Sequence, residues 1–503
     1  MTSLILTAIL LAPILGILII LFLPAAAKTA IRLTAAVVTG VGLALTVTAC
    51  AIYDQTVSGY QFILNVPWVE HLGISFHVGA DGISLVMLLL TAAVIFAGVF
   101  VSWRIEDRVK EHYILLLALV TGVFGVFMSL DMFFFYLFYE LAVAPMYLLI
   151  AVWGSTDKEY CAMKLTLYLT LGALIALAGL LILYAAAGEA TGEYTFDLLR
   201  LRQLAFPEKF QILLFPLIFL GFAVIVPMWP FHTWSPLGHA AAPASVSMLH
   251  AGVLMKLGAF AILRFGLDLL PMGAAYWLPW VAYISMFNIL YGGYVAMAQK
   301  DIKFIIGYSS SSHMGYVLLG IACVDTVGLS GAVFMMFAHG IMTALLFGLV
   351  GFFYDQTHTR MVPDLGGLSR QLPFVGVAFT IGALASSGLP GTANFVSELL
   401  VFIGAWKNYP LPVIAAVFGI VITAVYMLRA VAGVFFGPMA PKWGALTDAV
   451  KFRERLPYVL LIAILVVFGF APSLLVDLIK TGAAPLAEKV QTAQAALTAW
   501  SPF

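Results

Sequence analysis

The sequence has 503 residues, of which 63% are hydrophobic and 10% are charged, and its mean hydropathy is +1.07. A soluble domain has about 45–50% apolar and about 25% charged residues, and here 24 Lys and Arg residues balance 24 Asp and Glu residues. This composition excludes a cytosolic enzyme, a nucleic-acid-binding protein and a disordered scaffold, and it leaves a polytopic membrane protein.

About fourteen apolar runs follow one another along the chain, each long enough for the roughly 20 residues of a membrane-crossing helix. The first run has no cationic leader and no small-residue cleavage site, so we interpret it as a retained span. We predict an all-α polytopic membrane protein that forms a single membrane domain over 1–503. The predicted spans are 3–23, 30–53, 81–102, 112–130, 132–152, 164–187, 211–228, 243–270, 277–298, 303–323, 328–354, 373–406, 410–436 and 456–477.

The Lys and Arg residues are distributed unevenly between alternate loops. Fifteen lie in one set of alternate loops, six lie in the other set and the termini, and three lie within spans. Because cation-rich loops stay in the cytoplasm, the first set is predicted to be cytoplasmic. Both termini are then predicted to face outward.

Two of the predicted spans contain helix breakers. Span 7 ends in VPMWPFHTWSP, and span 12 contains SSGLPGTANF. Proline removes a backbone donor, and freed backbone groups at membrane depth must be satisfied by protein or by a water-filled cavity. Paired broken helices in inverted repeats are typical of transporters and mark the ion path. The alternative is two unrelated sets of prolines close to loops.

The two breaks lie five spans apart, and an odd offset reverses the orientation of a span. This spacing predicts two inverted five-helix repeats, spans 4–8 over 112–270 and spans 9–13 over 277–436. The N-terminal spans 1–3 occupy 1–102, and the last span with an outward tail occupies 456–503.

Five ionisable residues lie near the middle of five predicted spans: Glu140, Lys256, His313, His339 and Glu398. A charge at the bilayer centre costs at least about 2.5–3.5 kcal/mol, so each of them calls for an explanation. Their similar depth predicts one polar axis in the membrane plane. The alternatives are a structural ion pair between helices for Glu140 and capping of freed carbonyls by Lys256. For Glu398 the alternative is a structural role beside the break, and for His313 and His339 it is the role of ordinary core histidines.

Carboxylate, lysine and histidine together indicate proton transfer, because histidine relays protons through either ring nitrogen. A sodium path favours clustered oxygen ligands instead, and a sugar or lipid transporter needs a larger pocket. His250, six residues before the lysine, is a candidate to join the axis. His232 and His239, near the cytoplasmic end of span 7, are interpreted either as intake groups or as loop residues. Serines 309–312 are candidate anchors for water.

The sequence contains no recognisable cofactor or metal motif. The three cysteines have no metal-type spacing, and no phosphate-binding loop, dinucleotide fingerprint or zinc-protease motif is present. We therefore predict no metal and no redox cofactor in this chain.

Several segments carry a family resemblance: FYELAVAPMYLLI, PFHTW, AGVLMKLGAFAILR, QKDIKFIIGYSSSSHMGYV, FAHGIMTALLF and GLPGTANFVSE. Together they resemble the antiporter-like membrane subunits of respiratory complex I, the NADH–quinone oxidoreductase. The resemblance runs from about 75 to 435. It implies fourteen core helices with broken spans 7 and 12, and proton pumping driven by quinone reduction elsewhere in the complex.

The resemblance also implies partners and residue roles. FMN, iron–sulfur clusters and quinone are expected in partner subunits, and the partners are neighbouring antiporter-like chains and, through them, the hydrophilic redox arm, in the lipid of a bacterial inner membrane. By motif, Glu140 is similar to the family's span 5 glutamate, Lys256 to its central lysine, and Glu398 to its span 12 glutamate at the outlet. His313 and His339 match its relay histidines.

The chain departs from the family pattern at two positions. In GFAVIVPMW, Ile225 stands where the family normally has a lysine that pairs with the span 5 glutamate, and in WSPLGH, Leu237 replaces an acid. Glu140 is thus expected to lack its usual partner, and His250 is one candidate substitute. The rival hypothesis is a variant subunit whose cytoplasmic intake is altered or silent.

Three other functions remain open from the sequence. One is a subunit of a multi-subunit cation/proton antiporter, which sodium-dependent transport favours. Another is the membrane arm of a hydrogenase or ferredoxin-linked relative. The identity of the partner subunits distinguishes this candidate from complex I. The third is a purely structural membrane module. Full proton coupling after neutralisation of Lys256 and Glu398 favours this function.

Overall fold

The computed structural model describes residues 2–500, and almost all of its regular structure is helical. Helices suit a membrane because each satisfies its own backbone hydrogen bonds. The first nine are α1 (Ile5–Phe22), α2 (Lys28–Ile52), α3 (Gly82–Val101), α4 (Val109–Met128), α5 (Met132–Trp153), α6 (Lys158–Thr191), α7 (Leu198–Leu201), α8 (Glu208–Ile225) and α9 (Trp234–Ala241). The others are α10 (Ala244–Leu249), α11 (Met255–Ala261), α12 (Pro271–Ala298), α13 (Ile302–Ala322), α14 (Thr326–Thr357), α15 (Pro373–Ser386), α16 (Ala393–Trp406), α17 (Pro410–Phe435), α18 (Phe452–Phe470) and α19 (Ser473–Trp500).

The helical membrane architecture predicted from the sequence is confirmed, but the number fourteen stays a prediction. Within residues 2–500, eleven helices are long and apolar enough to cross a membrane, or twelve with the bent pair α18 and α19. Two predicted spans fall short. The span predicted at 303–323 is the serine-rich α13, and the one at 373–406 is divided into two 14-residue helices, α15 and α16.

A two-stranded antiparallel sheet between α2 and α3 was not predicted. It pairs β1 (Gln61–Val69) with β2 (Ile74–Ala80), with Asn65 opposite His77. The His77 carbonyl accepts a hydrogen bond from the Leu130 amide, and this ties the hairpin to the start of α5. The period-two pattern of ISFHV was hidden between two much stronger apolar runs.

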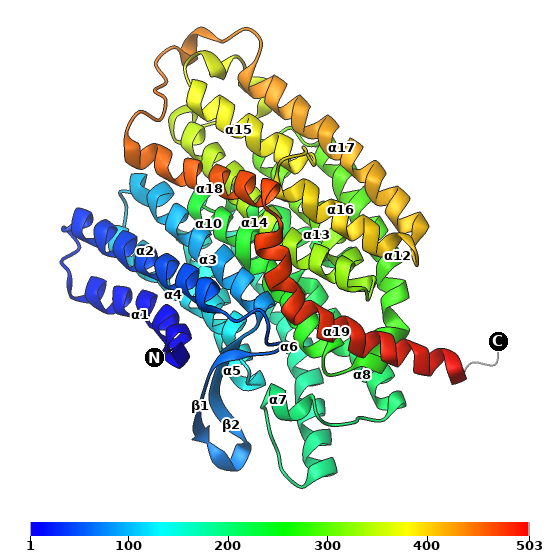
Figure 1. Ribbon diagram of the computed structural model, residues 1–503. Coiled ribbons are helices and arrows are strands. Elements are labelled where there is room, and N and C mark those ends of the chain that lie inside the picture. The colour runs from blue at the N-terminus through cyan, green and yellow to red at the C-terminus, as the bar shows by residue number, and fades with distance from the viewer. Residues whose placement is uncertain (1, 501–503) are drawn as a thin grey trace.

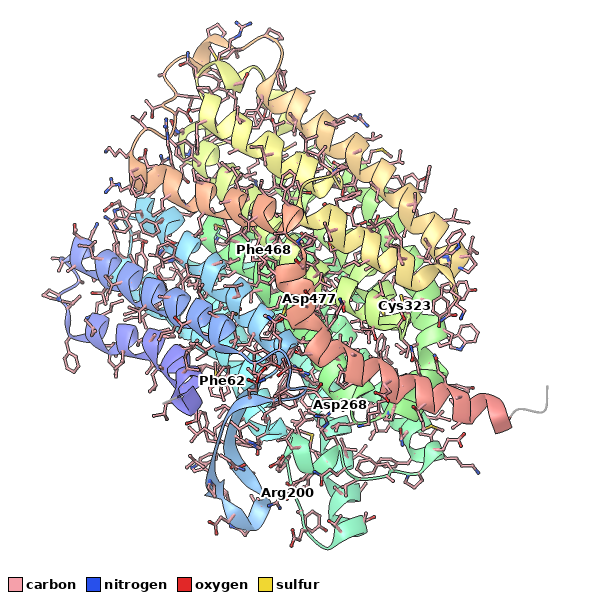
Figure 2. All side chains as sticks on the ribbon, viewed as in Figure 1. Phe62, Arg200, Asp268, Cys323, Phe468 and Asp477 are labelled. Atoms are coloured by element: carbon pink, nitrogen blue, oxygen red, sulfur yellow. The ribbon has the colours of Figure 1, made fainter. Side chains whose placement is uncertain are left out.

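The C-terminal segment is a helix that lies across the others. The axes of α18 and α19 differ by 75°, so the predicted last span, 456–477, extends past the bend. In Figure 1 the red α19 crosses in front of the other helices, and it contacts α3, α12 and α14. Lys489 Nζ of α19 lies 3.2 Å from Asp268 Oδ1. Figure 2 labels Asp268. The predicted outward tail is therefore packed on the helices.

An ion pair between loops lies at each end of the helix bundle. At one end, Arg360 Nη2 lies 2.9 Å from Asp301 Oδ2 and joins the segments that follow α14 and precede α13. At the other end, Arg202 Nε lies 3.3 Å from Asp268 Oδ1 and joins the segments that follow α7 and precede α12. The first pair belongs to the cation-rich loops and the second to the cation-poor loops, as the alternation of the sequence predicts.

Two spans form the centre of the molecule. They are α14 and the continuous helical segment Ala244–Leu267, which includes α10 and α11, and both are buried along their most apolar stretch. A helix that is apolar on every face belongs in the interior. The polar side chains that these two spans carry are therefore enclosed by the surrounding helices.

Candidate functional site

The first break separates α8 from α9, where the sequence has three prolines. The backbone groups freed there find protein partners. The Trp234 indole donates to the Val224 carbonyl over 3.0 Å, and the Trp229 amide donates to Asn288 Oδ1 over 2.8 Å. The broken span 7 predicted from the sequence is thus present, with α8 ending at Ile225 and α9 beginning at Trp234.

The second break separates α15 from α16 and places a carboxylate against a glycine. Gly388 and Gly391 have φ values of +68° and +92°, which favour glycine. A Cβ atom on Gly388 would clash with Glu398 Oε2. The side chain of Glu398 therefore reaches back to the break, and a larger residue at position 388 would displace it.

Lys256 and His339 form the centre of the site. Both side chains are completely buried, and Lys256 Nζ lies 2.8 Å from His339 Nδ1. The same Nζ donates to the Ala251 carbonyl. That carbonyl lies in a π-helical segment, His250–Leu254, and such segments are frequent at functional sites.

His313 connects this centre to the second break. Its ring lies 5.2 Å from the ring of His339, centroid to centroid. Nδ1 lies 2.7 Å from the Ser309 carbonyl, and Nε2 lies 3.2 Å from the carbonyl of Ser386, the last residue of α15. A carbonyl only accepts, so both contacts are hydrogen bonds when both ring nitrogens carry protons. This geometry suits a group that gains and loses a proton.

Buried polar atoms without a protein partner lie along the same line. Among the described residues they include His339 Nε2, Glu398 Oε2 and both ring nitrogens of His250. Leaving a buried polar atom unpaired costs about 1–3 kcal/mol. Unpaired buried polar atoms also occur elsewhere among the described residues, so these atoms support a proton path only together with the contacts that join Lys256, His339 and His313.

The predicted auxiliary histidines separate into two groups. The rings of His239 and His250 pack together with their centroids 4.0 Å apart and their planes tilted by 40°, and Ser235 Oγ lies 3.2 Å from His239 Nε2. His250 is also 5.3 Å from the ring of Trp234. His232, by contrast, lies against Tyr291 at 5.0 Å. Only His239 and His250 therefore form a pair on the side of the central lysine.

Glu140 lies apart from this row, half-buried near the surface of the chain, and its Oε1 is buried without a hydrogen-bond partner. The Tyr136 hydroxyl, one helical turn earlier, interacts with the same carboxyl group, and Leu137 and Leu141 beside it are about 40% exposed. Within residues 2–500, neither ring nitrogen of His250 has a hydrogen-bond partner, so no hydrogen bond joins His250 to Glu140. That coupling stays a prediction.

Both departures from the family pattern fill apolar positions. Ile225 is completely buried, and a Cβ atom on Gly258 would lie 2.9 Å from its Cβ. Ile225 therefore packs against Gly258, which follows Lys256 by two residues on α11. Leu237 is half-buried and packs against the core.

A buried lysine that the sequence placed in a loop belongs to the same region. Lys303, at the start of α13, donates from Nζ to the Ala242 carbonyl over 2.6 Å and is only 3% exposed. It lines a cavity of about 600 Å³ at the cation-rich end, together with Asp355 and His358. The run DIK at the start of an apolar segment gave no sign of this burial, because a cation in that position is usually solvated.

The site holds proton-transfer groups rather than metal ligands. Within the part of the chain that the structure describes, no group of three or more His, Cys, Asp or Glu residues is placed to hold a metal ion. A lysine facing a histidine suits transfer of a proton along a hydrogen bond. A row of such groups that leads to a carboxylate can carry a proton without a cofactor.

Comparison with known proteins gives a consistent result. The family described as "NADH:quinone oxidoreductase/Mrp antiporter, TM" matches residues 129–423. The chain is 36% identical over 480 residues to NADH-quinone oxidoreductase subunit M of Rhodobacter capsulatus, with 92% of each chain covered. It is also 36% identical to NAD(P)H-quinone oxidoreductase chain 4 1 of Synechococcus elongatus, with 88% and 83% covered.

Solved structures share the fold over nearly the whole chain. A subunit of respiratory complex I from Thermus thermophilus matches with a TM-score of 0.87 and 28% identity, covering 98% of this chain and 100% of that one. A chain of the Mrp complex from Dietzia sp. matches with a TM-score of 0.84 and 21% identity, covering 97% and 99%. The second likeness concerns the fold alone.

Proposed function

The chain belongs to the NADH:quinone oxidoreductase/Mrp antiporter transmembrane family, and on this premise we propose that it is a proton-translocating subunit of a complex I-type NADH–quinone oxidoreductase. The observation that carries the proposal is the row Lys256, His339, His313 and Glu398, which runs from the centre of the bundle to the second break.

Each member of the row has a distinct task. Lys256 holds a proton at the centre and passes it to His339 across their 2.8 Å contact. His339 and His313 relay it, because an imidazole accepts a proton on one nitrogen and releases one from the other. His313 delivers it at the break, where Glu398 receives it and releases it to the outer side. Glu140, half-buried near the surface of the chain, receives the charge change from a neighbouring subunit.

Proton intake follows a route that does not use position 225. The cavity beside Lys303 reaches the Ala242 carbonyl at the end of α9. On the same helix, His239 packs against His250, which precedes Lys256 by six residues. The cavity, His239 and His250 therefore supply protons to Lys256 in place of the glutamate–lysine pair that Ile225 removes. His232, which lies among tyrosines, stays outside this route.

The proposal assigns the redox chemistry to other subunits. The chain works as part of an oxidoreductase complex and binds no cofactor itself, whereas FMN, iron–sulfur clusters and quinone belong to its partners. Its neighbours are other antiporter-like membrane subunits, and through them the hydrophilic arm. The cation-rich end faces the cytoplasm, and both termini face outward from a bacterial inner membrane.

A second candidate function is a subunit of a multi-subunit cation/proton antiporter. The family description names Mrp antiporters beside the oxidoreductase, and the Mrp chain shares the fold. The same proton row then serves exchange driven by an ion gradient, with no redox partner. A membrane arm of a hydrogenase or ferredoxin-linked complex is a further relative of the same architecture.

Isolation of the intact assembly in mild detergent, followed by mass spectrometry of its subunits, separates these candidates. We expect flavin-binding and iron–sulfur subunits of the NADH-oxidising type, and NADH-driven proton uptake that does not depend on sodium. An assembly made only of small hydrophobic antiporter subunits, with sodium-dependent transport, would contradict the redox assignment and establish the exchanger.

A further inference from the structure

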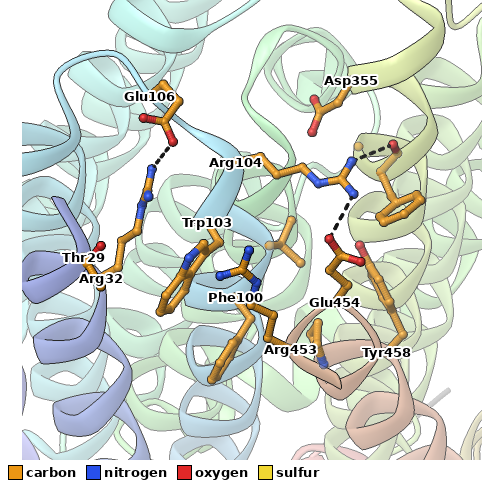
Figure 3. Close-up of a pocket in the computed structure, with 14 residues that line it drawn as sticks. Thr29, Arg32, Phe100, Trp103, Arg104, Glu106, Asp355, Arg453, Glu454 and Tyr458 are labelled. Atoms are coloured by element: carbon orange, nitrogen blue, oxygen red, sulfur yellow. Dashed lines mark hydrogen bonds and ion pairs between the residues drawn. The ribbon is translucent and has the colours of Figure 1, made fainter. Parts of the chain in front are cut away.

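A second cavity, outside the proton row, opens at the cation-rich end of the bundle. It has a volume of about 420 Å³, within the usual range for small-ligand sites. Figure 3 shows side chains from four places lining it: the start of α2, the end of α3, the end of α14 and the start of α18. These segments are far apart in the sequence, so the fold assembles the cavity.

Three arginines, Arg32, Arg104 and Arg453, and three carboxylates, Glu106, Asp355 and Glu454, line this cavity, and Lys28 adds a fourth cation beside Glu106. Glu106 is shared by Lys28, at 2.9 Å, and Arg32, at 2.6 Å, and these two cations lower the pKa of the Glu106 carboxyl to about 2. Arg104 lies 3.8 Å from Glu454. Glu106 thus serves two cations, and Arg453 has no carboxylate partner among the described residues, so its charge is available to an anion.

Two donors in the cavity lack a protein acceptor. Arg32 is 8% exposed and its Nε has no hydrogen-bond partner, although its Nη2 is fully engaged. Arg453 has no carboxylate within ion-pair distance among the described residues, and its guanidinium lies 5.7 Å from the Trp103 ring. Figure 3 shows the Arg453 side chain extending into the space beneath Trp103. A buried, unpaired guanidinium nitrogen is an unused anion contact.

The surface next to the cavity is apolar and exposed. On α2, the exposed side chains Leu33, Val37 and Val41 continue, at four-residue spacing, the face that carries Thr29 of the cavity. On α3, Phe100 lines the cavity and packs edge-on against Phe96 one turn deeper. The ligand site therefore opens onto a surface suited to hydrocarbon chains.

We propose that this cavity binds the phosphate headgroup of an anionic membrane phospholipid. The phosphate contacts Arg32 Nε and the Arg453 guanidinium, with the Thr29 hydroxyl beside it. The acyl chains lie along Leu33 and Val37 of α2 and the phenylalanines of α3. Basic pockets between spanning helices, with an interfacial tryptophan, are the chemistry that recognises such headgroups. The inference does not depend on the proton row.

The test measures phosphatidylglycerol binding to the delipidated intact assembly by native mass spectrometry, with phosphatidylcholine and inorganic phosphate as comparison probes. Arg453→Gln is the test variant, because Arg453 is exposed and has no carboxylate partner to leave unpaired. We expect it to weaken phosphatidylglycerol binding about tenfold, as loss of one charge-assisted hydrogen bond does. Thr29→Val is a second, milder variant with the same expected direction.

The matched control is Lys442→Gln, which removes one exposed cation from the same end but outside the cavity. It is expected to leave phosphatidylglycerol binding unchanged. Equal binding of phosphatidylcholine and phosphatidylglycerol, or no effect of Arg453→Gln, would overturn the proposal. Binding of inorganic phosphate as tight as that of the lipid would overturn the lipid assignment and indicate a soluble anion instead.

Discussion

Replacement of Lys256 by alanine is expected to lower NADH-driven proton translocation by about a hundredfold. A charge at the bilayer centre costs at least about 2.5–3.5 kcal/mol, and each 1.36 kcal/mol added to a barrier is a factor of ten in rate. Alanine carries no proton, and it leaves His339 Nδ1 without its 2.8 Å partner. The measurement is proton uptake by closed vesicles that contain the assembled complex.

Two further variants separate proton transfer from a merely structural charge. Lys256→Arg keeps the positive charge, but arginine does not release its proton, so translocation is expected to stay low. Lys164→Ala removes a lysine that lies over Tyr160 and Tyr168, away from the row, and is expected to translocate normally. Full activity of Lys256→Arg would mean that position 256 needs only a charge, and the proton-carrier role would be wrong.

Replacement of Glu398 by glutamine is the second large effect. The amide has the shape of the carboxylate but does not take up a proton. We expect translocation to fall about a hundredfold, the usual loss when a positioned proton-transfer group is removed. Because Glu398 Oε2 has no protein partner and lies against Gly388, the substitution removes no ion pair, and assembly and thermal stability are expected to be unchanged.

The matched variants for this prediction are Glu398→Asp and Glu189→Gln. Aspartate keeps a titratable group one methylene farther from the break and is expected to keep part of the rate. Glu189, at the exposed end of α6, is expected to be replaceable without effect. Normal proton translocation by Glu398→Gln would place the outlet elsewhere.

Much of the site was predictable because charge at membrane depth is so costly. The depths of Lys256, His313, His339 and Glu398 predicted a shared axis, and the structure brings the lysine and the two histidines into one row. The breaks were predictable because proline and glycine act locally. The place of Glu140 on the same axis stays a prediction: the residue is half-buried beside exposed leucines, and depth along a helix does not determine which face of the helix is buried.

Other contacts depend on the tertiary fold and have no local signal. The approach of His313 Nε2 to the Ser386 carbonyl joins residues 73 positions apart. The hydrogen bond from the Tyr426 hydroxyl to Ser309 Oγ, at 2.8 Å, spans 117 positions. The burial of Lys303 was also missed, because a cation before an apolar run is usually solvated. Helix packing alone decides these contacts.

The C-terminal segment shows a different limit of prediction from sequence. The apolar run at 456–477 and the mixed segment after it suggested a span followed by a tail. The structure has α18, a 75° bend and the long helix α19 instead. Leu475, Leu478, Ile479 and Leu486 of α19 are buried against the other helices. Their three- and four-residue spacing was present in the sequence, but it did not identify the surface that they cover.

The most direct test of the central claim compares His313→Gln, Glu398→Asp and the double variant in vesicles, with proton translocation measured per NADH oxidised. Residues that act as one unit have strongly non-additive effects. If both residues lie on one path, the double variant is expected to translocate protons within about twofold of the slower single variant. Losses that multiply in the double variant would contradict a single path from Lys256 through His313 to Glu398.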